Sequence, residues 1–293
     1  MLAMKSLLPL LLLTVASAAV HAQADPTSRS WNRPVEPYRI VGNLYYVGAS
    51  DITSYLIATP GGLILIDGGF AETVPLIREN LRKLGFKLGD VKVLLNSHAH
   101  YDHAGGLAEL KKATGAKLAA SAEDAALLAR GGRDDHVFGD RFPYTPVTAD
   151  RILKDGDTVA LGGSKLTAHL TPGHTKGCTT WTTQVDDGGT KRDAVFVCST
   201  SVLSEAKLTN NPRYPSVASD FEKTFRALRS LPCDVFLASH GAIYDREAKA
   251  ERLRKGTEKN PFVDPEGYRS YLDRSEKAFR DRLQAEKAEP AKP

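Results

Sequence analysis

Short apolar segments rich in β-branched and aromatic residues alternate along the chain with segments whose apolar residues recur every three or four positions. The first pattern predicts β-strands and the second predicts amphipathic helices. In the first third of the chain, strands are predicted at Tyr38–Val47, Ser54–Ala58, Leu63–Asp67 and Val91–Leu95. A helix is predicted at Glu72–Leu84, where the apolar residues keep helical spacing.

The rest of the chain repeats this order of strands followed by helix. Gly105-Gly106 open a predicted helix that runs through Lys112, and a second β-rich half extends from about Arg151 to Val197. Further helices are predicted at Asp220–Ser230 and Pro265–Ala285. No Pro/Ser-rich linker, low-complexity tract or constant repeat interrupts the sequence. We therefore expect residues 23–293 to form a single domain made of two similar halves.

The first residues have the layout of a secretory signal peptide. Lys5 precedes the apolar run Leu7–Val15, and small residues follow as far as Ala22. The run contains Pro9 and is short for a membrane span, which disfavours the alternative of a signal anchor. We expect residues 1–22 to be removed and the mature protein to reach the periplasm without a membrane anchor.

Composition and charge limit the partners. Hydrophobic residues make up 42% of the chain and charged residues 25%, as is ordinary for a globular protein. The formal net charge of +4 arises from 39 basic and 35 acidic residues, with no basic run and no basic stripe interleaved with aromatic residues. Nucleic acid is therefore not an expected partner.

The chain has three cysteines, an odd number, so at least one is unpaired if the protein is exported to an oxidising compartment. Cys178 and Cys198 begin and end a predicted pair of neighbouring strands, and we expect a disulfide between them. Cys233 would then be free. Three free thiols remain the open alternative.

Three of the eight histidines and one aspartate fall within six residues, directly after the strand predicted at Val91–Leu95. On a loop, His98 and His100 can turn their ring nitrogens toward one metal ion. Asp102 and His103 can then face a second ion a few ångströms away. The alternative is a solvated polar loop without metal, which the density of ligand-type residues disfavours.

Each ion needs one more protein ligand, and two histidines follow apolar segments that predict strands. These are His174 and His240. Layered α/β proteins gather strand ends at one edge, so we expect the three loops to meet there. The predicted first site is His98, His100 and His174, and the predicted second site is Asp102, His103 and His240. Taken alone, each of these two histidines is typical of an ordinary core or surface residue, as are His136 and His169.

The motif His98-x-His100-x-Asp102-His103, followed by Thr171-Pro-Gly-His174-Thr175 and by His240, resembles the metallo-β-lactamase superfamily. Gly173–Trp181 and Asn211–Pro215 are similar to the third subclass of class B β-lactamases. The resemblance implies an α/β (α+β) fold, a four-layer αββα sandwich with two Zn²⁺ ions per chain at the sheet edge. It also implies a monomer that hydrolyses the amide bond of a small-molecule β-lactam with a zinc-bound hydroxide.

The resemblance assigns roles to particular residues. Asp102 would ligate zinc and orient the attacking hydroxide. Ser199 and Ser201 are similar to hydroxyls that hold the substrate carboxylate directly or through water, and an ordinary Ser/Thr turn is the alternative. His103 stands where the first two subclasses have an arginine, so Cys198 is not needed as a ligand, although ligation by Cys198 stays open. Three aromatic residues either line the pocket or pack in the core: Trp31, Phe138 and Phe142.

Other functions remain open. A lactonase or thioesterase of the same superfamily would share the metal ligands, because ligands indicate the reaction type better than the substrate. Thioesterases such as glyoxalase II resemble the motif but use a bridging aspartate where this chain has no acid, at Val197–Ser201. A non-catalytic periplasmic zinc-binding protein is the remaining alternative, disfavoured because the predicted sites leave coordination positions open. Residues 202–208 contain no tyrosine, so no side chain is assigned to oxyanion stabilisation.

Overall fold

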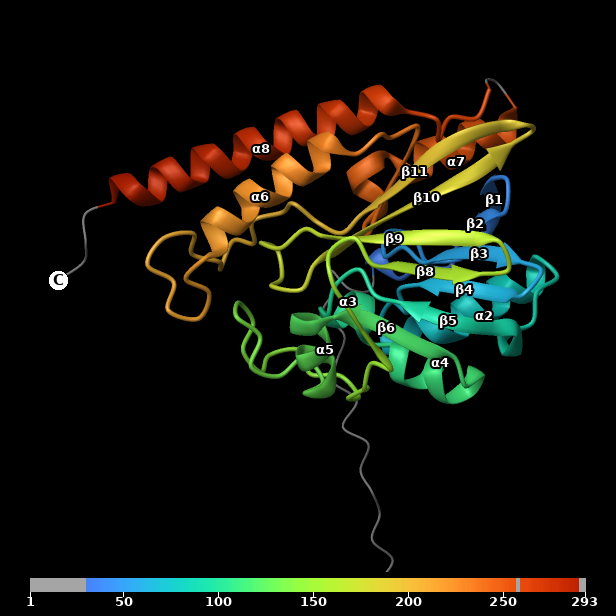
Figure 1. Cartoon of the computed structure of the whole chain (residues 1–293), viewed down its shortest axis with the longest axis horizontal. Helices are drawn as coiled ribbons and strands as arrows, with labels where there is room; N and C mark the ends of the chain where they lie inside the picture. Colours follow the sequence, from blue (N-terminus) through green and yellow to red (C-terminus); the bar gives the residue numbers. More distant parts are fainter. Residues whose placement is uncertain (1–29, 257–258, 290–293) are drawn as a thin grey trace, which may run out of the picture.

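Two β-sheets lie face to face with helices on their outer sides in the computed structural model, which describes residues 30–256 and 259–289 (Figure 1). The predicted signal peptide, residues 1–22, lies outside the described residues. Within the described part of the chain, no helix has both the length and the apolar character needed to cross a membrane.

The first sheet has seven strands among the described residues, in spatial order β1 to β7. They are β1 (Tyr38–Val41), β2 (Leu44–Tyr46), β3 (Tyr55–Thr59), β4 (Gly62–Ile66), β5 (Val91–Leu95), β6 (Lys117–Ser121) and β7 (Arg151–Leu153). The second sheet has the order β12-β11-β10-β9-β8. Its strands are β8 (Thr158–Leu161), β9 (Ser164–Leu170), β10 (Thr179–Asp187), β11 (Thr190–Val197) and β12 (Val235–Ala238).

Helices form the two outer layers (Figure 1). The α-helices are α2 (Val74–Lys83), α3 (Tyr101–Ala104), α4 (Leu107–Thr114), α5 (Ala122–Ala129), α6 (Val217–Ser230), α7 (Arg246–Lys255) and α8 (Pro265–Ala288). Short 3₁₀ helices occur at η1 (Ala71–Thr73), η2 (Leu88–Asp90) and η3 (Gly241–Tyr244). In Figure 1, α2, α4 and α5 lie on the side of the first sheet, and α6 and α8 lie on the side of the second. The predicted four-layer αββα sandwich is therefore confirmed.

The core strands are buried on both faces. Successive side chains of a strand point to opposite sides of the sheet. Ile57 and Ile64 pack in the core between the two sheets, where Trp181 of β10 also lies. Leu56 and Leu65 point the other way and pack under α2 and α4. Burial on both faces explains why β3 and β4 are almost continuous apolar runs rather than alternating ones.

The structure differs from the predicted elements at several places. The strand predicted at Tyr38–Val47 is a hairpin of β1 and β2, because the chain turns at Gly42 with φ of +51°. The β-rich half predicted to begin at Arg151 starts in the first sheet, since β7 pairs with β6. The helix predicted from Gly105 begins later, as α4, and α3 precedes it.

The sequence does not predict β6, α5 and α7. The segment Lys117–Ala129 is rich in alanine. Its pattern of apolar residues therefore shows neither where the strand ends and the helix begins nor which face of the helix is buried. In the structure Ser121 is the N-cap residue of α5, and its side-chain oxygen accepts a hydrogen bond from the backbone N–H of Asp124. The helix α7 consists almost entirely of polar residues and has no apolar stripe that would predict it.

A disulfide joins Cys178 to Cys198, as predicted, and Cys233 is a free thiol. The bond ties the start of β10 to the segment that follows β11. Because Cys198 is covalently paired, its sulfur is not a free thiolate, and the alternative in which it ligates a metal is not supported.

Replacing both bonded cysteines, Cys178→Ala and Cys198→Ala together, should lower the free energy of unfolding by about 3 kcal/mol. The bridge closes a loop across a sequence separation of 20 residues, and loops of this size restrict the unfolded chain by about that amount. Denaturant unfolding of the double variant and of the control Cys233→Ala measures the difference. Equal midpoints for the double variant and the control would contradict this expectation.

Candidate metal centre

The segment that carries the histidine cluster is held in place by a buried aspartate at the end of a neighbouring strand. Asp67 follows β4 and adopts φ of +62°, a left-handed conformation uncommon outside glycine. Its carboxylate accepts hydrogen bonds from the backbone N–H of Ser97 at 2.7 Å and from Ser97 Oγ at 2.6 Å. Because β4 and β5 are parallel, this contact fixes the loop that leaves the carboxyl end of β5.

Paired glycines allow a second close approach at the same edge. The N–H of Gly68 donates to the carbonyl of His103 at 2.9 Å, and the N–H of Gly106 donates to the carbonyl of Gly69 at 3.0 Å. A Cβ atom on Gly106 would lie 2.3 Å from the carbonyl oxygen of Gly68. Position 106 therefore has no room for a side chain, because two backbone segments touch there. These backbone contacts fix α3 against the end of β4.

The structure brings together the three residues of the predicted first site. One possible ligand atom from each of His98, His100 and His174 lies within 4.8 Å of the others. All three side chains are buried, although they belong to the loop after β5 and to the turn between β9 and β10. Edge-to-face ring contacts, with centroids 4.8 Å apart, place His174 against both of the other rings.

The three residues of the predicted second site also converge. Nε2 of His103 lies 3.2 Å from Nε2 of His240. An Asp102 oxygen, Oδ2, lies 3.3 Å from the His103 nitrogen and 3.5 Å from the His240 nitrogen. Asp102 and His103 lie on the short helix α3 rather than on a loop, whereas His240 follows β12. The two groups adjoin, since possible ligand atoms of His98, Asp102 and His103 also lie within 4.8 Å of one another.

The second ring nitrogen of most of these histidines faces a protein oxygen. Nδ1 of His240 is 2.8 Å from Oδ2 of Asp51, and Nδ1 of His174 is 2.9 Å from the carbonyl of Ser201. For His98, the Nδ1 atom lies 3.1 Å from the hydroxyl of Ser97. Contacts of this kind select the ring tautomer and leave the other nitrogen, Nε2, directed at the centre of the cluster.

Burial and neighbouring charge set the protonation of the cluster. Burial, reinforced by neighbouring imidazoles, lowers the pKa values of His98 and His174 well below 6.5. Burial opposes charge on Asp102 as well, but His103 and His240 hold the pKa of this carboxyl well below its usual range. Although burial acts against it, the two carboxylates of Asp102 and Asp51 raise the pKa of His240 to about 9.

The donor set fits a metal centre. Nε2 of His98, the ring nitrogen turned away from Ser97, is buried and has no hydrogen-bond partner among the described residues. A buried polar atom without a partner costs free energy, so this nitrogen needs an explanation. Imidazole nitrogens with one carboxylate are the ligands that zinc prefers. The neutral imidazoles of His98 and His174 and the ionised carboxylate of Asp102 are also the forms that bind metal.

The predicted substrate-contact residues lie near the cluster, but they differ in exposure. Ser201 is exposed, and its carbonyl contacts His174. Ser199 is buried, and its hydroxyl accepts a hydrogen bond from the N–H of Ser201 at 3.2 Å, which is the Ser/Thr turn held open as the alternative. Trp31 packs edge-on against His240, and Phe138 packs against His100, with centroid distances of 5.4 and 5.0 Å.

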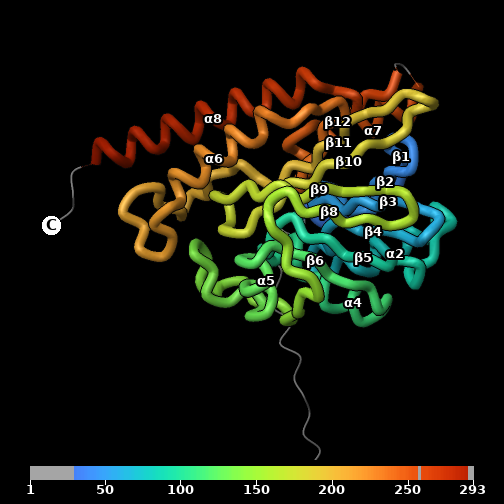
Figure 2. Tube along the Cα trace, viewed as in Figure 1, coloured from blue at the N-terminus to red at the C-terminus, as the bar shows by residue number. Residues whose placement is uncertain are grey.

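Two loops flank the histidines at one end of the sandwich. They are residues 130–150, which follow α5, and residues 198–216, which precede α6, and both lie at the same end in Figure 2. Arg141 pairs with Glu205 at 3.0 Å, and Arg213 pairs with Asp134 at 2.5 Å, so the loops contact each other. These pairs are exposed and contribute little stability.

Sequence reasoning missed the acidic residues that support the histidines. Asp51, Asp67 and Asp135 each place a carboxylate oxygen within 3.7 Å of a site histidine nitrogen. They lie far from the motif in sequence and look like ordinary turn residues. The Asp67-Gly68-Gly69 sequence at the end of a buried strand was the available signal, because glycines there indicate a close backbone approach.

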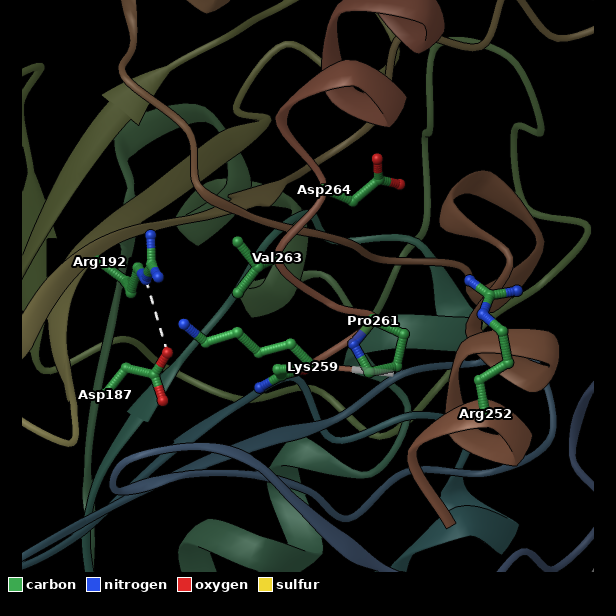
Figure 3. A pocket seen from close by; sticks show the side chains of 8 residues that line it. Asp187, Arg192, Arg252, Lys259, Pro261, Val263 and Asp264 are labelled. Carbon is green, nitrogen blue, oxygen red and sulfur yellow. Dashed lines mark ion pairs between the residues drawn. The ribbon is translucent and has the colours of Figure 1, made fainter. Parts of the chain in front are cut away.

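A polar cleft of about 460 Å³ lies away from the histidine cluster (Figure 3). None of the six predicted ligands lines it. Arg192 pairs with Asp187 at 3.5 Å, and Asp264 pairs with Lys249 at 2.7 Å, so three charged residues of the cleft have partners within the protein.

Comparison with known proteins agrees with this architecture. A family model described as the metallo-beta-lactamase superfamily matches residues 47–240. The native FEZ-1 metallo-beta-lactamase from Legionella gormanii is 43% identical, with a TM-score of 0.86, over 88% of this chain and 99% of that chain. The class B3 di-zinc metallo-beta-lactamase LRA-12 from an Alaskan soil metagenome is 38% identical, with a TM-score of 0.82, over 86% of this chain and 96% of that chain.

Curated relatives match shorter segments. A hydroxyacylglutathione hydrolase from Rhodospirillum rubrum is 35% identical over 130 residues, which are 44% of this chain and 41% of that protein. The chain spans about half the length of the first curated relatives that it matches.

The chain belongs to the metallo-beta-lactamase superfamily, because the family model covers more than half of it. Its solved neighbours include metallo-beta-lactamases of subclass B3, so the predicted similarity to the third subclass is confirmed.

Removing metal from the purified protein should lower its melting temperature. A ligand that binds only the folded state stabilises it by about 3 kcal/mol when its free concentration is 100 times its Kd. For a domain of this size that corresponds to roughly 5–10 °C. Thermal unfolding before chelation, after chelation and after zinc is restored measures the effect. A melting temperature that is the same in all three samples would show that the cluster does not bind zinc in the folded protein.

Proposed function

We propose that this protein is a β-lactamase that hydrolyses the amide bond of β-lactams with two zinc ions at the edge of the sandwich. The observation that carries the proposal is the convergence of two adjoining groups of three ligand side chains at one edge. The likeness to proteins named metallo-beta-lactamases over 88% of the chain supports the choice of substrate.

Each ion would be held by three side chains. The first zinc would be held by His98, His100 and His174, and the second by Asp102, His103 and His240. Three protein ligands leave coordination positions open, as catalytic zinc sites do. When bound, zinc supplies a water of lowered pKa, about 7, and polarises a carbonyl oxygen.

The side chains around the metals would orient the reactants. Oδ2 of Asp102 contacts His103 and His240, which leaves Oδ1 to accept a hydrogen bond from the attacking water and fix its direction. No serine or cysteine nucleophile is needed. The aromatic rings of Trp31 and Phe138, each packed against a site histidine, would exclude bulk water from the reacting atoms.

Ser201 and Ser199 would bind the substrate carboxylate. Ser201 is exposed beside His174, so its hydroxyl is available for a direct contact. Ser199 is buried with its hydroxyl hydrogen-bonded to the N–H of Ser201, so it would act through a water molecule. Together the two residues would fix which end of the substrate faces the metals.

The end of β11 favours an amide substrate over a thioester. The thioesterases that the motif resembles need an acid there, and this chain has Cys198, bonded to Cys178, followed by Ser199. The missing acid does not exclude a lactonase on the same scaffold. A carrier protein would bind zinc without turnover. We further propose that the protein acts in the periplasm as a monomer.

Purified protein should hydrolyse a carbapenem or a cephalosporin, lose this activity on chelation and regain it when zinc is restored. A lactone and a thioester are assayed in parallel under the same conditions. Zinc-dependent loss of a lactone or a thioester, with the β-lactams left intact, would overturn the substrate. Zinc binding with no turnover of any substrate would support a carrier instead.

Replacing Asp102 with Asn should lower kcat by about 10²–10⁴-fold, because a neutral amide cannot take a proton from the attacking water and is a weaker zinc ligand than a carboxylate. The matched control is Asp281→Asn, since Asp281 is an exposed carboxylate on α8. Unfolding midpoints of the metal-free proteins check that both variants fold. An unchanged kcat in a folded Asp102→Asn variant would remove Asp102 from its assigned role.

A further inference from the structure

Asp135 lies in a tight turn of the loop after α5 and uses only one of its carboxylate oxygens there. Its backbone forms a two-bond bridge with Gly139, with N···O distances of 3.1 and 2.9 Å. Oδ1 accepts hydrogen bonds from the N–H groups of Val137 and Phe138, both at 2.8 Å. The turn therefore fixes the orientation of the carboxylate and leaves Oδ2 for another partner.

The remaining oxygen faces a ligand of the first metal site. Oδ2 of Asp135 lies 3.6 Å from Nε2 of His100, and the two side chains are 3% and 5% exposed. Neither atom has a hydrogen-bond partner among the described residues. Oδ2 is also 3.8 Å from Nδ1 of His136, a longer separation. Leaving both a carboxylate oxygen and an imidazole nitrogen buried and unpaired is costly, so these two atoms are natural partners.

We propose that Asp135 is the positioning residue of the first metal site: it accepts a hydrogen bond from Nε2–H of His100 and leaves Nδ1 of that ring to bind the metal. The inference rests on the metal sites of the proposed function and not on the identity of the substrate. A carboxylate behind a ligating histidine fixes the tautomer and the ring direction and makes the other nitrogen a better donor. Asp135 does not touch the substrate or the metal.

The second site has a parallel arrangement, which provides a comparison within the same protein. Oδ1 of Asp51 accepts a hydrogen bond from the N–H of Ala242 at 2.7 Å, while Oδ2 lies 2.8 Å from Nδ1 of His240. In both aspartates one oxygen holds a turn and the other faces a metal-site histidine. The aspartates therefore serve different sites and should affect them separately.

The same turn connects the first metal site to a cluster of aromatic side chains. Phe138, whose N–H is held by Asp135, packs its ring against His100 with centroids 5.0 Å apart. The ring of Phe138 also lies 5.2 Å from that of Phe142, and the guanidinium of Arg141 lies over both rings. A change at Asp135 therefore acts on His100 both directly and through Phe138.

The test is a stepwise zinc titration of the metal-free protein against a chromophoric chelator. In Asp135→Asn, the amide oxygen still accepts from the turn, but its NH₂ group faces Nε2–H of His100 and cannot accept a hydrogen bond. We expect one zinc affinity to weaken by about 10–100-fold, the range found when such outer partners are removed. The affected step should be the one that His174→Ala abolishes. Asp51→Asn should weaken the step that His240→Ala abolishes.

Asp140→Asn is the matched control, because Asp140 is an exposed carboxylate in the same loop that holds the N–H of Asp134 and faces no histidine. Its two zinc affinities should equal those of the unmodified protein. A folded Asp135→Asn variant with unchanged affinities would overturn the proposal, as would one in which the step of His240 is weakened instead.

Histidine ¹⁵N spectra of the unmodified zinc-loaded protein give a second test that does not depend on a variant. We expect His100 to be bound through Nδ1 with a protonated Nε2. Binding through Nε2 would overturn the proposal. Because these measurements use zinc alone, a protein that binds two zinc ions without hydrolysing β-lactams would refute the substrate and leave the role of Asp135 standing.

Discussion

The structure depends on holding five imidazole rings and one carboxylate at one edge of a sandwich with their donor atoms directed inward. Imidazole rings crowded at this density would turn away from one another unless their outer nitrogens were held. Protein oxygens from four different parts of the chain lie behind these rings: Asp51, Ser97, Asp135 and Ser201. Behind them, Asp67 fixes Ser97, and glycine contacts fix α3. The fold therefore holds the ligand side chains close together, and a bound metal ion supplies the partner that their inward-facing donor atoms need.

The arrangement of the metal-site residues also depends on how the two sheets pack against each other. The histidines come from segments that follow β5, β9 and β12, which belong to different sheets. Trp181 of the second sheet donates a hydrogen bond from Nε1 to the carbonyl of Asn96, beside the histidine loop of the first. The disulfide at Cys178 and Cys198 lies at the same edge, and the N–H of Thr179 donates to the carbonyl of Ser97. The packing between the two sheets therefore also sets the positions of the metal-site residues.

The sequence predicts the six candidate ligands because four of them fall in one short motif and the other two follow apolar strand patterns. It also predicts the αββα sandwich, through the resemblance that this motif carries. It does not predict Asp51 or Asp135, because a carboxylate that supports a histidine through space leaves no local pattern. Periodicity fails for a similar reason at β6 and α5, where an alanine-rich segment has no distinct apolar face, and at α7, where nearly every side chain is polar. The split of β1 from β2 depends on a single turn at Gly42.

Anomalous diffraction from crystals of the zinc-loaded protein, recorded on both sides of the zinc absorption edge, would locate the metal ions directly. We expect two zinc peaks at the edge of the sandwich. The first should lie among the ring nitrogens of His98, His100 and His174, and the second among the donor atoms of Asp102, His103 and His240. A single peak, or a second peak bound by other side chains, would contradict the assignment of two zinc sites to these six residues.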